Sequence, residues 1–377
     1  MSGETESTVT DQPEDGSLLD LVDPRKMSGV QRLGLLGLGL LAIFGPVGIV
    51  AGLELRVIQM TGALIFATYV MTWDVVSGYT GEISFGHALF FGVGAYTSAI
   101  LNTQLELSLF LTIPAGILAA ALAGLLIGFP SLRLHGPYFS LITLVTPIIL
   151  ISVLVFQPDI TGGATGLSGV DTLTRDTVLS YYLAFGVFLL TLVTFLAITR
   201  SDAGIVLTAI REDEVAVQAA GLNPQKFKLF AFVLSGAFGG LAGSIALHSA
   251  HLGGFAAPSD LLALVLSIEV IVAAILGGMG TITGAAVGGI TFYMVVRLLR
   301  NVPVLGEFYF LLFAVLTLLF LFFVPEGIVP RVLRELKGRQ TDATVAADGG
   351  RTPLEITVRK FAEQLRELVG LKGGDER

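Results

Sequence analysis

Long apolar stretches recur along nearly the whole sequence, and they constrain its fold more than any other feature. About ten segments carry roughly 20 mostly apolar residues each, the length that an α-helix needs to cross a bilayer. In lipid the backbone must satisfy its own hydrogen bonds, which favours helices. The sequence therefore predicts an all-α polytopic membrane protein with spans at 33–53, 57–76, 83–102, 108–130, 138–157, 178–199, 229–248, 263–279, 281–299 and 307–325.

The composition supports a membrane location and divides the chain into three parts. Charged residues make up 14% of the chain, against about 25% in soluble domains. The first 32 residues are acidic and hold no apolar core, so we expect no secretory signal there. We expect an acidic disordered N-terminal tail at 1–32, a transmembrane domain at 33–330, and a C-terminal tail at 331–377 with an amphipathic helix at 352–372.

Lysine and arginine are unevenly divided between the two sets of connections. Cytoplasmic loops carry an excess of these residues, and an even number of spans puts both termini on one side. With the N-terminus inside, twelve basic residues fall on the inner side and four on the outer side, so we expect both termini to be cytoplasmic. The inner residues are Arg25, Lys26, Arg32, Arg133, Arg200, Arg211, Lys226, Lys228, Arg331, Arg334, Lys337 and Arg339; the outer ones are Arg56, Arg175, Arg297 and Arg300.

The connection 200–228 is the longest on the predicted inner side. Residues 203–220 contain no proline and one early glycine, and Gly221 followed by a Leu-Asn-Pro sequence provides a helix stop. Arg211 and Glu214 would stand three apart on one helix face. We predict one short helix along the inner membrane surface, with a plain surface connector as the alternative. On the outer side, residues 158–177 are glycine-rich and too irregular for a span.

The sequence offers no catalytic constellation. It has no cysteine and no H-E-x-x-H or G-x-S-x-G motif, and its four histidines are scattered. It also has no G-x-x-x-x-G-K-[ST] loop, so we expect no ATPase, enzyme activity or cofactor in this chain. The net charge of −8 comes mostly from the tails and provides no basic patch for nucleic acid.

Four ionisable residues fall within or beside predicted spans, where such groups are functional candidates. Asp74 and Glu82 are close to predicted span ends, so we expect both to meet interfacial water. His87 and Glu269 lie within spans, where a packing role and a polar-lined path are both possible.

Two glycine clusters share one outline at distant positions. Gly78, Gly81 and Ile83 have the same spacing as Gly277, Gly280 and Ile282. Paired glycine-interrupted segments are typical of a translocation pathway built from related halves, although close helix packing explains either cluster alone. The predicted path residues are Gly78, Gly81, Ser84, Gly86, His87, Glu269, Gly277, Gly278 and Gly280.

Five passages resemble the permease subunits of branched-chain amino-acid ABC importers, in particular the LivM-like members of the LivH/LivM permease family. They are, in order, "SGYTGEISFGHALFFGVGAYTSAIL" (77–101), "LRLHGPYFSLITL" (132–144), "TGGATGLSGV" (161–170), "AIREDEVAVQAAGLNPQKFKLFAFVLSGAFGGLAGSI" (209–245) and "LGGMGTITGAAVGG" (276–289). The resemblance extends over about residues 33–330 and leaves out the tails.

The resemblance implies a multi-pass subunit of the cell membrane that works by alternating access. Its partners would be a second LivH-like permease, two cytoplasmic ATPases that bind ATP and Mg, an extracytoplasmic binding protein and the lipid bilayer. The loop 200–228 would contain the coupling helix, although Glu214 stands seven residues before Gly221 and Val215 occupies the usual acidic site. The implied coupling residues are Ala209, Arg211, Glu214, Ala219, Ala220 and Gly221.

Three alternatives remain at this point. Relatives that import urea or short amides share these motifs, so the substrate is open between them and leucine, isoleucine and valine. A secondary transporter driven by an ion gradient would need no docking helix in the loop 200–228. A passive channel would conduct without partner subunits.

Overall fold

The computed structural model describes residues 29–134, 137–249, 254–300, 311, 314, 315, 318 and 327–331. These residues form helices and connecting turns, and the β-structure among them is one isolated bridge between Leu167 and Ala256. The chain divides into two compact units, Met1–Ile43 and Phe44–Arg377. Helix α1 crosses this boundary, and the residues discussed below belong to the second unit.

The all-α polytopic fold is confirmed, whereas the count of ten spans is not. Seven helical segments are long and apolar enough to cross a membrane within the described residues. Predicted span 33–53 overlaps α1, which is apolar enough only over the 15 residues Leu36–Val50. Predicted span 83–102 starts too early, because α3 begins at Ala88, and the last turn of α3 contains the polar residues 102–104. The described residues leave out most of the predicted tenth span, 307–325. They also leave out the residues before 29 and after 331, and with them the predicted helix 352–372. The long helices are α1 (Gly29–Val50), α2 (Glu54–Trp73), α3 (Ala88–Leu105), α4 (Leu109–Ser131), α5 (Pro137–Phe156), α7 (Thr177–Thr199), α10 (Pro224–His248), α12 (Leu264–Gly277) and α13 (Ile282–Arg300).

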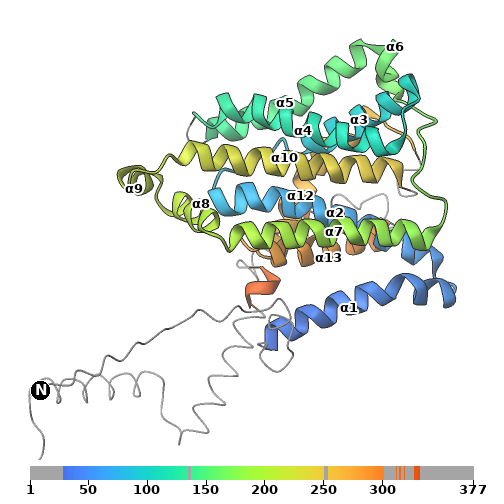
Figure 1. Cartoon of the computed structure of the whole chain (residues 1–377), viewed down its shortest axis with the longest axis horizontal. Coiled ribbons are helices and arrows are strands. Elements are labelled where there is room, and N and C mark those ends of the chain that lie inside the picture. Colours follow the sequence, from blue (N-terminus) through green and yellow to red (C-terminus); the bar gives the residue numbers. More distant parts are fainter. Residues whose placement is uncertain are drawn as a thin grey trace, which may run out of the picture. The chain divides into compact units, whose positions relative to one another are not determined.

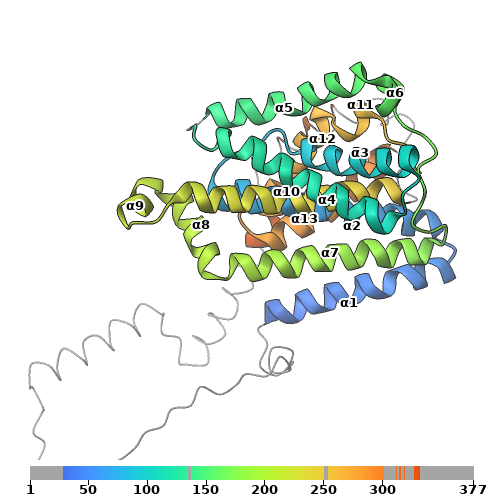
Figure 2. The same cartoon turned by 45° about the horizontal axis from the view of Figure 1, so that its top comes forward.

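Helices α2 and α10 lie at the centre of the second unit (Figure 1). Helix α2 packs against α7, α10, α12 and α13, and α10 packs against α3 and α4, as the turned view of Figure 2 also shows. Glycines allow this contact between backbones: a Cβ atom on Gly94 of α3 would collide with the backbone of Gly240 in α10. Small residues at helix crossings are the usual device for close packing in membranes. Packing therefore explains Gly94 without a helix break.

The two ends of this helix bundle differ in structure. At one end lie the short helices α8 (Asp202–Glu212) and α9 (Glu214–Ala219), between the end of α7 and the start of α10. We call this the α8–α9 end. At the opposite end the connection 157–176 holds only α6 (Pro158–Thr161) and the 3₁₀ turn η2 (Gly163–Thr165), so its predicted irregularity is confirmed. His248 Nδ1 holds this connection through the carbonyl oxygen of Asp171, at 2.6 Å.

The helix predicted over 203–220 is wrong as a single element. Asp213 has an extended backbone (φ −156°, ψ 98°) and separates α8 from α9. Its carboxylate Oδ1 accepts hydrogen bonds from the N–H groups of Val215 and Ala216, at 2.9 and 3.0 Å, and so acts as the N-cap of α9. Because a capping aspartate favours a new helix start over helix continuation, the run breaks there. Arg211 and Glu214 are consequently not neighbours on one helix face.

Candidate functional site

Helix α8 contacts the membrane helices through Arg211. The Arg211 Nη1 atom donates a hydrogen bond of 2.6 Å to the carbonyl oxygen of Gly78, the last residue of the π-helical turn η1 (Asp74–Gly78) that follows α2. Gly204, Leu207 and Ile210 form the buried side of α8 and fix its position on the bundle. The predicted coupling residue Arg211 therefore touches the first predicted path glycine directly.

Helix α9 contacts the same region through an ion-pair cluster around Lys228. The Lys228 ammonium, on a side chain only 3% exposed, lies 2.6 Å from a carboxylate oxygen of Glu82 and 2.8 Å from one of Glu214. Glu82 was expected to meet interfacial water, but its side chain is 13% exposed and paired. Together Lys228, Glu82 and Glu214 connect α10, the turn after α2, and α9.

The remaining predicted coupling residues lie on the outward side of this end. The exposed residues are Ala209 of α8, Ala219 at the end of α9, and Ala220, which follows α9. Gly221 adopts φ +85° and directly follows the last turn of α9. The N–H of Gly221 donates to the carbonyl oxygen of Gln218, and the N–H of Leu222 donates to the carbonyl oxygen of Val217. This pair of hydrogen bonds is the Schellman motif that ends a helix. The predicted helix stop at Gly221 is confirmed.

The two glycine clusters lie side by side at the α8–α9 end. The N–H of Gly280 donates a hydrogen bond of 2.7 Å to Asp74 Oδ1, and a Cβ atom on Gly78 would lie only 2.6 Å from the nitrogen of Gly280. Gly81 and Gly280, which occupy the same position in the repeated outline, have nearly equal φ angles of 79° and 78°. The repeat seen in the sequence thus includes a shared positive φ angle at Gly81 and Gly280, which L-residues with a Cβ atom rarely adopt.

Gly277 and Gly278 serve the packing of the second cluster. A Cβ atom on Gly277 would collide with the backbone of Gly284 in α13, and Gly278 has a φ angle of 123°. These glycines let α12 end and α13 begin within a few residues.

The segment from Gly81 to His87 is non-helical backbone placed among the helices. After α2 the chain forms a π-helical turn, η1 (Asp74–Gly78), and α3 begins only at Ala88. Non-helical backbone at membrane depth is tolerated only where protein satisfies its polar groups. The structure meets this condition with side chains from three helices, α2, α5 and α12. The bonds are Trp73 Nε1 to the Ser84 carbonyl (2.8 Å), Ser140 Oγ to the Ile83 carbonyl (2.7 Å), the Phe85 N–H to Thr143 Oγ1 (3.2 Å) and the Ala88 N–H to Ser267 Oγ (2.9 Å).

His87 and Ser84 lie in a buried polar cluster at the end of this segment. His87 Nε2 is 2.7 Å from Thr72 Oγ1 and 3.4 Å from Ser235 Oγ. Within the described residues, the Oγ atom of Ser84 and Nδ1 of His87 have no hydrogen-bond partner. Gly86, next to His87, packs directly against the backbone of Thr143 in α5.

Glu269 lies apart from the other predicted path residues. It is on α12, one carboxylate oxygen 3.3 Å from Arg300 Nη2 at the end of α13. Because α13 begins beside Gly280 and ends at Arg300, this pair belongs to the half of the bundle away from α8 and α9. Within the residues described, no group of three histidine, aspartate or glutamate side chains is arranged to hold a metal ion.

Two residues of this region were missed or misplaced by the sequence analysis. Lys228 was counted only as a charge for orientation, and Asp74 was expected in interfacial water but is fully buried against Gly280. The partner of Asp74 lies 206 residues away, so its position near a span end gave no signal of this contact. Nothing local in the sequence pairs Lys228 with Glu82, 146 residues away.

Comparison with known proteins agrees with this architecture. The family described as "Branched-chain amino acid transport system / permease component" matches residues 57–323. The high-affinity branched-chain amino acid transport system permease protein LivM of Escherichia coli (strain K12) is 31% identical over 336 residues, which cover 81% of this chain and 77% of that protein. Its counterpart in Salmonella typhimurium is 30% identical with the same coverage.

A more distant relative comes from an archaeon. The probable LivM permease of Methanocaldococcus jannaschii is 26% identical over 275 residues, covering 64% of this chain and 78% of that protein. No solved structure matches the chain. The family match extends over most of the chain and includes both glycine clusters and helices α8 and α9. The chain belongs to the family of branched-chain amino acid transport system permease components and is a LivM-like member of it.

Proposed function

We propose that this chain is the permease subunit of an ATP-driven ABC importer that moves branched-chain amino acids across the cell membrane by alternating access. Its partners are a second, LivH-like permease, two cytoplasmic ATPases and an extracytoplasmic substrate-binding protein. The names and family of its relatives support the substrate class. The α8–α9 end faces the cytoplasm, in keeping with the excess of basic residues there.

One observation carries the proposal: the segment assigned to coupling is bonded to the irregular backbone between the membrane helices. Arg211 of α8 holds the carbonyl oxygen of Gly78, and Lys228 holds Glu214 of α9 and Glu82 together. Movement of α8 and α9 therefore acts on both glycine clusters without an intervening element. A ligand changes a conformational equilibrium only through contacts that differ between the two states, and in the proposed cycle these bonds supply that difference.

The outward surface of α8 and α9 fits a protein partner. Ile205 and Val215 are 65% and 73% exposed, beside the small exposed residues Ala209, Ala216 and Ala219. Large apolar side chains at a charged membrane surface are typical of a binding face. In the proposed assembly one ATPase binds here and transmits nucleotide-driven closure to α8.

We predict that Ile205→Asp and Val215→Asp each reduce ATPase binding about tenfold or more, because a charge would be buried in the interface. Both side chains are exposed, so the permease should insert and fold normally. The measurement is co-purification of the ATPase with the membrane assembly, together with ATP-dependent leucine uptake in proteoliposomes. Gln225→Asp, an exposed residue at the start of α10, is the matched control and should bind normally.

The same proteoliposomes separate the proposed importer from an ion-driven carrier. Uptake should require ATP and all partner subunits, and it should continue when a protonophore dissipates the proton gradient. Full ATPase binding by both aspartate variants, or uptake that stops with the protonophore while ATP is held constant, would contradict the proposal.

A further inference from the structure

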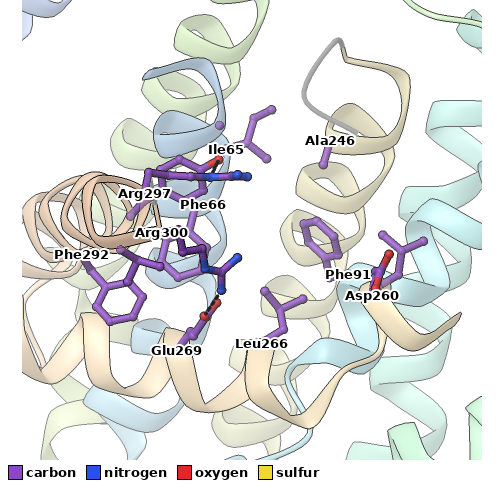
Figure 3. A pocket seen from close by; sticks show the side chains of 14 residues that line it. Ile65, Phe66, Phe91, Ala246, Asp260, Leu266, Glu269, Phe292, Arg297 and Arg300 are labelled. Atoms are coloured by element: carbon purple, nitrogen blue, oxygen red, sulfur yellow. Dashed lines mark hydrogen bonds and ion pairs between the residues drawn. The ribbon is translucent and has the colours of Figure 1, made fainter. Parts of the chain in front are cut away.

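A cavity of about 210 Å³ lies in the half of the bundle away from α8 and α9. Figure 3 shows its lining from close by. Helices α2, α3, α10, α12 and α13 and the short helix α11 (Pro258–Leu261) contribute to its wall. Pockets for drug-sized ligands measure about 300–1,000 Å³, so this cavity suits a smaller molecule. Its volume is that of about seven water molecules at about 30 Å³ each.

Among the described residues that line the cavity, the charged side chains balance one another. Asp260 and Glu269 supply two negative charges, and Arg297 and Arg300 supply two positive ones. Glu269 and Arg300 form an ion pair of 3.3 Å, with side chains 16% and 37% exposed. Arg297 Nε donates to the hydroxyl oxygen of Tyr293 at 3.0 Å, which fixes its orientation. A neutral site with separate positive and negative groups favours a ligand that carries both charges.

Apolar side chains form the rest of the wall. Phe66 and Phe292 lie on the side of Arg297 and Arg300, whereas Phe91 lies across the cavity beside Asp260 (Figure 3). Leu266 lies between the two sides, one helical turn before Glu269. Aromatic and aliphatic surface beside one ion pair fits a small molecule with a charged head and an aliphatic side chain.

We propose that this cavity is a binding site for a zwitterionic amino acid, in which the Glu269–Arg300 ion pair opens and exchanges partners with the substrate. Arg300 takes the α-carboxylate and Glu269 takes the α-ammonium group. In an α-amino acid the carboxylate and the ammonium group are attached to the same carbon atom. In the ion pair the Arg300 guanidinium and the Glu269 carboxylate are also neighbours, 3.3 Å apart, so both can be reached by one amino acid. The aliphatic side chain lies against Phe66, Phe91 and Leu266. This assignment rests on the proposed import of branched-chain amino acids, and it adds a site within the membrane chain itself.

This exchange of ion-pair partners explains why the site would select a branched-chain amino acid over urea or a short amide, the two substrate classes that the sequence left open. A zwitterion replaces both partners of the ion pair, so neither Arg300 nor the more deeply buried Glu269 loses its counter-charge. Urea or an uncharged amide offers neither charge, and the intact ion pair then remains more favourable. Opening the ion pair without a replacement is unfavourable chiefly for Glu269, whose side chain is 16% exposed and would be left with no counter-charge. The cavity therefore selects amino acids over neutral amides.

The test measures equilibrium binding by calorimetry to the assembled permeases and ATPases in nanodiscs, with the binding protein left out. The three probes are leucine, leucinamide, which lacks the carboxylate, and 4-methylpentanoate, which lacks the ammonium group. The unmodified transporter should prefer leucine over each analogue by about tenfold or more, the value of one charge-assisted contact.

Each variant should lose one preference only. Glu269→Gln should bind leucine and 4-methylpentanoate about equally, and Arg300→Gln should bind leucine and leucinamide about equally. Arg175→Gln, an exposed arginine in the connection before α7, is the control and should keep both preferences. Unchanged preferences in the two cavity variants, or an equal loss of all three probes, would refute the site, because a merely structural or lipid-binding pair does not distinguish the analogues.

ATP-driven leucine uptake by the complete transporter separates this inference from the proposed function. If the unmodified assembly binds leucine in the predicted pattern but does not import it with ATP, the proposed function fails and the site remains. If it imports leucine and the cavity variants retain both analogue preferences, the site fails and the proposed function remains.

Discussion

Replacing Lys228 with methionine is expected to abolish most ATP-driven uptake and to lower the free energy of unfolding by about 3 kcal/mol or more. Lys228 is the only described cation within ion-pair distance of Glu82 and Glu214. Without it, two largely buried carboxylates face each other with no counter-charge, and the contact between α9 and the turn after α2 is lost. The measurements are thermal unfolding of the purified assembly and the ratio of leucine transported to ATP hydrolysed.

Two further variants separate the loss of coupling from the loss of stability. Lys226→Met removes an exposed charge two residues away and should leave both measurements unchanged. The triple variant Lys228→Met, Glu82→Gln and Glu214→Gln removes all three charges, so most of the stability should return. Its uptake should stay low, because the charged connection between α9 and the glycine turn is still missing. Normal uptake in the triple variant would show that this connection is not required.

Features of the fold that depend on local or repeated sequence could be predicted from the sequence. Apolar stretches placed the membrane helices because each helix satisfies its own backbone in lipid. Gly221 was identified as a helix stop from its own position in the chain, and the repeated outline located two glycines, Gly81 and Gly280, with nearly equal φ angles. In each case the residues that determine the conformation lie within a few positions of one another.

The candidate site could be predicted only in part, because its contacts join distant parts of the sequence. Arg211 and Gly78 are 133 residues apart, and Asp74 and Gly280 are 206 apart. Polarity near a span end suggested interfacial water for Asp74, but tertiary packing buried it against a backbone N–H group. The break at Asp213 was missed for a different reason: an aspartate inside a helix pattern can also cap a new helix, and periodicity does not distinguish the two.

Gly86→Ala is expected to have the second large effect, a loss of about 3 kcal/mol or more in stability together with most of the uptake. A Cβ atom at this position would collide with the backbone carbonyl of Thr143 in α5. Backbone atoms of a packed helix cannot rotate away as a side chain can, so the non-helical segment and α5 must separate. The hydrogen bonds from Phe85 N–H to Thr143 Oγ1 and from Ser140 Oγ to Ile83 would then lengthen or break.

Gly186→Ala is the matched control for this prediction. Gly186 lies within α7, and a Cβ atom there would meet nothing within 4 Å. Alanine is the better helix former by about 0.5–1 kcal/mol, so the control should be at least as stable as the unmodified protein and should transport normally. Thermal unfolding and leucine uptake of both variants provide the comparison.

The collision at Gly86 involves the main chain of Thr143, and this gives the prediction a second test. Shortening the Thr143 side chain cannot relieve a clash with its carbonyl oxygen, and it also removes the acceptor for the Phe85 N–H group. The double variant Gly86→Ala and Thr143→Ala should therefore be no more stable than Gly86→Ala alone. Recovery of stability in the double variant would mean that only side-chain packing opposes the added methyl group. Continued instability would mean that the backbone of the non-helical segment rests directly on α5, where a change in the position of either element must move the other.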